Sequence, residues 1–379
     1  MPEGAATKNT RILVAGTFDP EYARNRVILA LLARGDFIVD VVNRPLWSGE
    51  RHTIVNRRKT ALALRAVRVY AGLLRSVLRA QKPDAILVLY PGHFDMPVVA
   101  AAARIRGIPV LFDPFISLHD TISGDRALRA PDSILGRIMR RIDQIACRLA
   151  TLVLADTPEH ADYFSELTKV PRSRFRVLWV GAPEDVFRPV EDVDARPNSV
   201  LFYGTFIPLQ GVDTIVEAAK LLEADQVHVR LVGNGQERPA AERLVEALGA
   251  SNVEFADPVA FEQLPNEIAG AVLCLGIFGT TAKAQRVIPN KLFQCIAVGR
   301  PVVTADTPAI RSAFSGEVAV TPPGNAQMLA ATIRELLQDE VRREALAKAG
   351  RARFLSDYSE AALAQMFTGY IEELMATRR

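Results

Sequence analysis

The sequence predicts an α/β protein made of two parallel-sheet domains, and three observations support this prediction. The chain has 379 residues, which is too long for a single hydrophobic core and suits two domains. Short β-branched runs alternate with helix-length segments, a pattern typical of parallel sheets that helices cover on both faces. The alternation stops at residues 188–199, a mostly polar stretch with two prolines, and then starts again. We interpret residues 188–199 as a linker.

The first domain is expected to span residues 1–187. Its strands are expected at Arg11–Gly16, Phe37–Val42, Ala85–Leu89, Pro109–Phe112, Leu152–Leu154 and Arg174–Val180. Helices are expected between them, at about Tyr22–Ala33, Ile54–Arg79, Met96–Arg106, Ile134–Ala150 and Glu159–Leu167. The strands are short apolar runs and the helices follow a helical period, so each segment has one preferred state.

The second domain is expected to span residues 200–356 and repeats the alternation. Its strands are expected at Val200–Tyr203, Val227–Val232, Val253–Phe255, Ala271–Leu275, Pro301–Thr304 and Val318–Val320. Helices are expected at Asp213–Leu222, Glu237–Leu248, Ala326–Leu337 and Glu340–Phe354. Ser356 or Ser359 is expected to cap a last helix that ends near Met375, within a segment, residues 357–379, that returns to the first domain. Parallel sheets bind ligands outside the carboxyl ends of their strands, so the two domains should face a central cleft.

Charge is distributed unevenly along the chain. Residues 1–190 hold 28 Lys and Arg against 19 Asp and Glu, a net of +9, whereas the remainder holds 18 against 24, a net of −6. This asymmetry indicates that the first half meets an anionic surface or substrate.

The cysteine usage and the apolar runs place the chain in a reducing, aqueous compartment. Cys147, Cys274 and Cys295 are far apart and show neither a disulfide framework nor metal-ligand spacing. Because His, Asp and Cys also form no clustered ligand pattern, no metal cofactor is expected. The N-terminus lacks the apolar core of a signal peptide, and no apolar run approaches the roughly 18 residues of a membrane-spanning helix. We therefore predict a cytoplasmic protein that is soluble or peripheral on the inner face of the membrane.

The stretch Gly276–Val303 has the composition of an anion site. It contains a glycine-broken loop, a Pro289-Asn290-Lys291 turn into a short apolar helix, and a Gly-Arg-Pro stop before a strand. The first turn of such a helix presents unpaired backbone N–H groups and the positive end of the helix dipole. Lys283 and Arg286 add two further cations nearby. We expect phosphate groups to bind here.

Three sequence pieces occur in a fixed order in the second half. They are YGTFIPLQGVDTIVEAAKLL (203–222), VRLVGNGQERPAAERLVEALG (229–249) and PNKLFQ followed by GRPVV (289–303). With this order the chain resembles the retaining glycosyltransferases of family 4, which have the GT-B fold of two Rossmann-like parallel-sheet domains facing a central cleft. The resemblance implies transfer of a sugar from a UDP- or GDP-linked donor to an acceptor held by the first domain. The acceptor would be lipid-linked or a glycan under construction. No GxGxxG motif follows the first strand, which weakens a dehydrogenase interpretation.

The chain departs from the family pattern at four positions. The family usually has two glutamates eight positions apart, and Arg286 and Gln294 stand there. It also usually has an Arg and a Lys that grip the diphosphate, and Thr205 and Gln210 stand there. We predict that the phosphate-binding charge has been relocated to Lys283, Arg286 and Lys291; the alternatives are a solvated basic face or lost donor binding. The predicted donor site comprises Gly204, Thr205, Gln210, Gly233, Asn234, Lys283, Arg286, Pro289, Asn290, Lys291 and Gln294.

Three residues of the first domain are candidate catalytic groups. His93 and Asp113 follow strands, and His119 lies in the loop after Asp113. Family members often keep an acceptor-domain histidine after the fourth strand, but the spacing here places Phe115 near that position. The alternative for each histidine is a structural hydrogen-bonding role. No carboxylate pair has acid/base spacing, which a retaining transfer tolerates because the leaving diphosphate can accept the acceptor's proton.

The segment between Glu50 and Asp84 holds nine Lys and Arg and no acid. On a helical wheel one side carries Arg58, Arg65, Arg68, Arg75 and Arg79, and the opposite arc is apolar and includes Val67 and Leu78. A basic amphipathic helix is typical of contact with an anionic membrane surface. The alternative is a helix packed on the sheet with a solvated basic face. No aromatic residues are interleaved with the basic ones, so nucleic acid is not expected.

A hexosyltransferase-type glycosyltransferase is therefore the predicted function. Two alternatives stay open at this point. One is a nucleotide-sugar epimerase-like GT-B enzyme. The other is a degenerate, non-catalytic homologue that acts as a membrane-associated partner.

Overall fold

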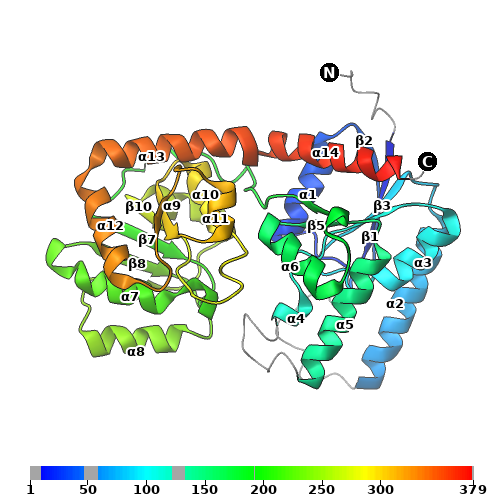
Figure 1. Cartoon of the computed structure of the whole chain (residues 1–379), viewed down its shortest axis with the longest axis horizontal. Coiled ribbons are helices and arrows are strands. Elements are labelled where there is room, and N and C mark those ends of the chain that lie inside the picture. Colours follow the sequence, from blue (N-terminus) through cyan, green and yellow to red (C-terminus); the bar gives the residue numbers. More distant parts are fainter. Residues whose placement is uncertain (1–9, 47–58, 122–132, 192, 378–379) are drawn as a thin grey trace.

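The computed structural model describes residues 10–46, 59–121, 133–191 and 193–377. Two six-stranded sheets, each with helices on both faces, form two lobes that lie side by side (Figure 1). Every strand pair is parallel, so the predicted two-domain α/β fold is confirmed.

The N-terminal sheet has the strand order β2-β1-β3-β4-β5-β6. Its strands are β1 (Thr10–Gly16), β2 (Phe37–Asn43), β3 (Ala85–Val88), β4 (Val110–Phe112), β5 (Leu152–Ala155) and β6 (Phe175–Val177). Its helices are α1 (Ala23–Arg34), α2 (Lys59–Arg79), α3 (Met96–Arg106), α4 (Leu118–Asp120), α5 (Ile134–Leu149) and α6 (Pro158–Thr168), with a 3-10 turn at Arg172–Arg174. Apolar residues of α2, α3, α5 and α6 cover one face of this sheet, and those of α1 and the last helix cover the other.

The C-terminal sheet has the order β12-β11-β10-β7-β8-β9. Its strands are β7 (Ser199–Tyr203), β8 (His228–Val232), β9 (Val253–Ala256), β10 (Leu273–Leu275), β11 (Val302–Ala305) and β12 (Ala319–Thr321). The chain builds outward from β7 in one direction, then returns to add β10 on the other side of β7. The boundary between β7 and β10 is thus the topological switch point, where sheets of this kind bind ligands.

The helices of the C-terminal domain divide between the two faces of this sheet. They are α7 (Val212–Leu221), α8 (Arg238–Leu248), α9 (Leu264–Ala269), α10 (Asn290–Val298), α11 (Pro308–Ala313), α12 (Ala326–Gln338) and α13 (Glu340–Arg353). Short 3-10 turns lie at Pro208–Gln210, Glu223–Asp225 and Phe261–Gln263. Helices α7, α8 and α12 pack on one face, and α9, α10 and α11 pack on the other.

The end of the chain crosses back to the N-terminal domain. A π-helical turn at Phe354–Tyr358 joins α13 to α14 (Glu360–Ala376), and the two helices run across both lobes (Figure 1). The Ser359 side chain caps α14 by accepting a hydrogen bond from the backbone N–H of Ala362 at 3.2 Å. Phe367 and Ile371 of α14 are fully buried in the N-terminal core. This burial of apolar surface anchors the final helix there.

The strands and long helices lie within a few residues of their predicted ends. Helices α4, α9 and α11 were not predicted, because three to six residues are too few to show a helical period. The predicted helix at residues 54–79 is described only from Lys59 onward, so Arg58 lies outside the described residues. Within the described ranges, no helix is both long enough and apolar enough to cross a bilayer. The exact domain limits stay predictions.

Candidate active site

Three loops meet at the switch point of the C-terminal sheet. They follow β7, β8 and β10, three adjacent strands. A Cβ atom on Gly233 would lie 2.0 Å from the carbonyl oxygen of Gly204, and one on Gly211 would lie 2.5 Å from the backbone nitrogen of Gly279. Both glycines also have positive φ. The glycines at these two positions are therefore needed for the backbones of the three loops to touch.

Helix α10 starts at this switch point. Pro289 is its N-cap residue, one position before the first turn in which the sequence placed it. The amine of Lys291 is buried and donates to Gln210 Oε1 at 2.6 Å and to the carbonyl of Gly276 at 3.3 Å. It also lies 3.6 Å from the ring centroid of Phe202. Burial lowers the pKa of Lys291 well below its usual value, because a charged amine loses its hydration there.

The other predicted donor residues of this domain differ in exposure and in partners. Gln294 is buried, and its Oε1 accepts a hydrogen bond from the Tyr203 hydroxyl at 2.8 Å. Thr205 and Asn234 are exposed. Lys283 is buried at the start of the segment that leads to α10. The structure thus brings Gln210 and Lys291 into direct contact, and it gives Gln294 a separate partner.

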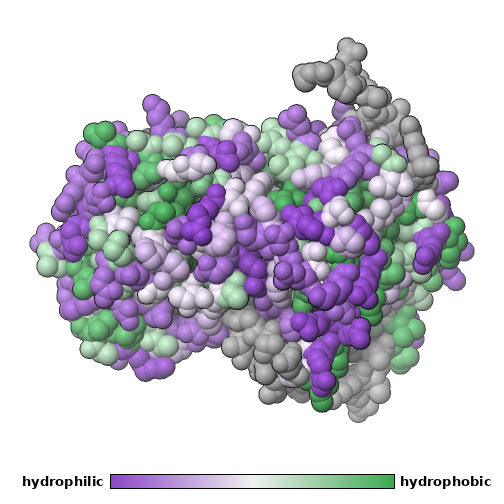
Figure 2. Space-filling view, in the orientation of Figure 1, coloured by the Kyte–Doolittle hydropathy of each residue, from purple (hydrophilic) through white to green (hydrophobic). Residues whose placement is uncertain are grey.

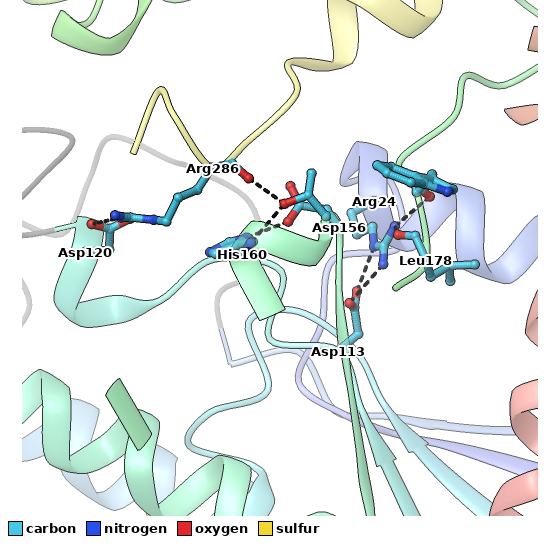
Figure 3. Close-up of polar contacts among 9 residues, drawn as sticks. Arg24, Asp113, Asp120, Asp156, His160, Leu178 and Arg286 are labelled. Carbon is cyan, nitrogen blue, oxygen red and sulfur yellow. Dashed lines mark hydrogen bonds and ion pairs between the residues drawn. The ribbon is translucent and has the colours of Figure 1, made fainter. Parts of the chain in front are cut away.

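Arg286 reaches across to the N-terminal domain. Its Nη2 lies 3.1 and 3.2 Å from the two carboxylate oxygens of Asp120 (Figure 3). Its guanidinium carbon lies 3.9 Å from the ring centroid of Tyr163, and its carbonyl accepts a hydrogen bond from the Thr157 hydroxyl. Both ends of this residue are therefore held by the N-terminal domain. Whether Lys283, Arg286 and Lys291 bind phosphate stays a prediction.

Asp113 is placed in a buried ion pair with Arg24. Arg24 Nε lies 3.0 Å from Asp113 Oδ2, and Nη2 lies 3.2 Å from Oδ1 (Figure 3). The same guanidinium donates to the carbonyls of Leu178 and Trp179 at 2.8 and 3.0 Å. Burial raises the pKa of Asp113, and the positive charge of Arg24 opposes that rise. This geometry favours a structural role, since Asp113 joins β4 to α1 and to the chain after β6.

His93 and His119 both contact Asp143 of α5. The His93 ring is fully buried, with Nδ1 3.0 Å from the Pro91 carbonyl oxygen and Nε2 3.3 Å from Asp143 Oδ1. Burial lowers the pKa of His93. The backbone N–H of His119 donates to Asp143 Oδ2 at 3.0 Å, and its Nδ1 lies 3.0 Å from the Gly136 carbonyl oxygen. These contacts fit the structural alternative for both histidines, and their catalytic roles stay predictions.

A buried pair at the start of α6 was not predicted from the sequence. Nδ1 of His160 lies 2.5 Å from Oδ1 of Asp156 (Figure 3). Between them Thr157 caps α6 by accepting a hydrogen bond from the His160 N–H at 3.0 Å. The signal was present in DTPEH, where a capping threonine follows a strand and an Asp stands four residues before a His.

Within the described ranges, no group of three or more His, Cys, Asp or Glu could hold a metal ion. Cys147, Cys274 and Cys295 are buried and form no disulfide bond. The site residues described above offer hydrogen bonding and charge at the boundary between two Rossmann-like domains.

Comparisons with known proteins agree with this architecture. The family model described as "Glycosyl transferase 4-like domain" matches residues 28–181, and the model "Glycosyl transferases group 1" matches residues 197–339. The chain is 23% identical over 293 residues to an alpha-D-kanosaminyltransferase of Streptomyces kanamyceticus, covering 72% of each chain. It is 24% identical over 246 residues to the lipopolysaccharide core biosynthesis glycosyltransferase LpsD of Rhizobium meliloti, covering 59% of this chain and 69% of that one.

Among solved structures, the fold is similar to that of Anabaena Alr3699/HepE in complex with UDP and glucose. The TM-score is 0.69 at 17% identity, with 96% of this chain and 100% of the Anabaena chain covered. The two family models occupy both domains in the order of the GT-B fold, and the named relatives are glycosyltransferases. The resemblance seen in the sequence is confirmed, and the chain belongs to the family 4-like glycosyltransferases of GT-B fold as a hexosyltransferase-type enzyme.

Proposed function

We propose that this glycosyltransferase moves a hexosyl group, with retention, from a UDP- or GDP-linked donor to a glycan or lipid-linked acceptor. The donor diphosphate occupies the switch point between β7 and β10, and the acceptor is held by the N-terminal domain. The Anabaena neighbour with UDP and glucose supports a nucleotide-sugar donor. The name of the Rhizobium relative supports a glycan acceptor that is attached to lipid.

One observation carries the proposal. The N-terminus of α10, a nine-residue helix, opens at the switch point beside loops whose backbones touch through Gly211 and Gly233. Backbone N–H groups at a helix start favour anionic oxygen. A diphosphate is the anionic part of the donor that a GT-B enzyme binds, so this position fits it.

The reaction needs little covalent chemistry from the protein. The bond between the anomeric carbon and the phosphate oxygen breaks, and the acceptor oxygen bonds to the same face of that carbon. The acceptor proton passes to the leaving diphosphate, so no side-chain base is required. The protein contributes positioning and stabilisation of charge on the diphosphate.

We further propose that α2 and α5 contact an anionic membrane surface. Of the five predicted arginines, Arg68, Arg75 and Arg79 of α2 are exposed. The other two differ: Arg58 lies outside the described residues, and Arg65 is half-buried with a partner. In the arc expected to be apolar, Leu73 and Val77 are buried against the sheet, whereas Val67 and Leu78 are exposed. Apolar side chains next to charged heads suit a lipid interface better than a purely basic face.

Helix α5 presents a similar mixture. Its exposed apolar residues are Ile134, Leu135, Ile138, Ile145 and Leu149. Its exposed basic residues are Arg137, Arg140, Arg141 and Arg148. Figure 2 shows hydrophobic and hydrophilic surface side by side along this edge of the N-terminal domain. Membrane contact would bring a lipid-linked acceptor to the N-terminal domain.

The transfer is tested by incubating the chain with UDP- and GDP-hexoses and lipid-linked glycan acceptors in the presence of EDTA. Retention predicts that the product has the anomeric configuration of the donor, read from the anomeric proton coupling in NMR. Turnover without a metal is also expected. A product with the opposite anomeric configuration would contradict retention. If turnover is lost in EDTA and divalent metal restores it, the reaction depends on a metal. Conversion of the donor without an acceptor would favour an epimerase.

A further inference from the structure

One ring nitrogen of His160 is buried without a hydrogen-bond partner among the described residues. The side chain is 1% exposed. One ring nitrogen, Nδ1, is engaged by Asp156 at 2.5 Å. The other, Nε2, is buried and has no hydrogen-bond partner among the described residues. A buried polar atom without a partner is destabilising, so such atoms are rare unless a ligand or water satisfies them.

Asp156 holds a proton on Nδ1 of His160, because its carboxylate accepts the hydrogen bond from that nitrogen. Burial by itself would raise the pKa of Asp156, but the contact with His160 and the nearby Arg24 together place that pKa below its usual value, so Asp156 is a carboxylate. A phosphate oxygen at Nε2 would place a second anionic group beside the ring. Two anionic partners favour the imidazolium, whose Nε2–H donates to that oxygen.

The pair of Asp156 and His160 lies where the N-terminal domain meets the segment that carries Arg286. Asp156 follows β5, and α6 begins directly after it. Thr157 of the same turn donates to the Arg286 carbonyl. Tyr163, one turn along α6, stacks with the His160 ring at 6.1 Å and with the Arg286 guanidinium at 3.9 Å. Figure 3 shows His160 next to Asp156, and the Arg286 side chain extending toward Asp120.

The opposite side of the proposed site is short of positive charge. Thr205 and Gln210 offer no cation, and the buried Lys291 amine already donates a hydrogen bond to Gln210. Arg286 is partly neutralised by Asp120. A donor diphosphate carries negative charge that needs cationic hydrogen-bond donors, and the N-terminal domain supplies one in His160.

We propose that the Nε2–H of His160 donates a hydrogen bond to a phosphate oxygen of the bound nucleotide-sugar, with Asp156 fixing the ring orientation and charge. The inference rests on the proposed function and assigns one phosphate contact to the N-terminal domain. Because Nε2 is shielded from solvent, the contact requires the Arg286 segment, which packs on the same tyrosine, to shift when the donor binds. His160 then links donor binding to the arrangement of the two domains.

The test is a calorimetric titration of UDP and GDP into the wild type, His160→Gln and Asp156→Asn. Glutamine keeps a side-chain N–H but has no charge, and asparagine removes the carboxylate that holds the ring. A charge-assisted hydrogen bond predicts that each variant binds the diphosphate roughly 10- to 100-fold more weakly. Affinity for the matching nucleoside, uridine or guanosine, followed by ligand-detected NMR, should stay unchanged because it lacks phosphate.

His228→Gln is the matched control. His228 also pairs with a carboxylate, Glu254 at 2.8 Å, but it lies at the amino end of the C-terminal sheet. Equal diphosphate affinity in His160→Gln and the wild type would overturn the inference and leave the proposed function standing. Equal weakening of diphosphate and nucleoside would also overturn it, since that result marks a general loss of structure. A wild-type chain that binds neither diphosphate would remove the proposed function and this inference together.

Discussion

Arg286 of the C-terminal domain and Asp120 of the N-terminal domain form an ion pair across the domain boundary, with Nη2 3.1 Å from Oδ1. Their side chains are 18% and 8% exposed, so solvent screens the pair only in part. The residues are 166 positions apart in sequence. A guanidinium that the sequence assigns to phosphate is thus occupied by a carboxylate from the other domain.

Asp120→Asn should strengthen binding of the donor diphosphate. A carboxylate and a phosphate compete for the same guanidinium, so removing the carboxylate charge frees Arg286 for the phosphate. An ion pair worth up to about 1 kcal/mol predicts a gain in UDP or GDP affinity of about two- to fivefold, measured by calorimetry. Asp162→Asn, which breaks an exposed pair with Arg172 on the same domain, should change nothing. Weaker binding in Asp120→Asn would show that Asp120 holds Arg286 in place instead of competing for it.

Asp113→Asn should reduce stability more than catalysis. The substitution leaves the fully buried Arg24 without its counter-charge, and breaking one side of a buried pair costs about 3–5 kcal/mol. Chemical denaturation would measure this loss. The double variant Arg24→Met with Asp113→Leu should recover part of it, because neither charge is then buried. Turnover per folded molecule should persist in Asp113→Asn. If turnover is lost while the free energy of unfolding is unchanged, Asp113 is catalytic instead.

Asp156 makes the stability of the chain sensitive to acid. Its pKa in the folded chain lies below the usual 3.8, so the folded state binds fewer protons than the unfolded state between those two values. The stabilisation is therefore fully present above pH 3.8 and is lost as pH falls through the folded pKa. Melting temperatures of wild type and Asp156→Asn should differ most above pH 3.8 and converge as the pH falls below 3.8. A difference that is constant across this range would contradict the assigned shift.

Membrane contact should depend on both the apolar and the basic residues of α5. Flotation with vesicles containing phosphatidylglycerol should recover the wild type, and vesicles of phosphatidylcholine alone should recover much less. The pair Ile134→Ser and Ile138→Ser should lower recovery severalfold by removing apolar contact. Val341→Ser removes an 80% exposed apolar residue from the other domain and serves as the control. Equal recovery with the two kinds of vesicle would contradict the membrane proposal.

The fold was predictable because its signals are local. Apolar runs mark each strand, and Ser359 marks the start of the last helix through its capping hydrogen bond. The ordered glycine motifs contain Gly211 and Gly233, the two positions where a Cβ atom would collide with a neighbouring loop. Those features depend on a few neighbouring residues, which a sequence displays directly.

The partners of the site residues were not predictable in the same way. Arg24 and Asp113 are 89 positions apart, and Gln210 and Lys291 are 81 apart. Such contacts depend on how elements pack and on how the two domains lie together. The sequence therefore placed Lys291 near a helix start but gave no sign that Gln210 holds its amine in a buried position. The pair of Asp156 and His160 is local by contrast, because the two residues are four positions apart, yet it was not predicted.

The central claim is that the donor diphosphate binds at the start of α10 through relocated cations. Calorimetric titration of UDP and GDP into the wild type, Arg286→Ala and Lys291→Ala tests it most directly, with the exposed Arg311→Ala as the control. The account predicts that the wild type binds at least one of the two diphosphates. Each of the two site variants should bind it roughly 10- to 100-fold more weakly, as expected for a lost charge-assisted hydrogen bond. Unchanged affinity in both Arg286→Ala and Lys291→Ala would contradict the claim.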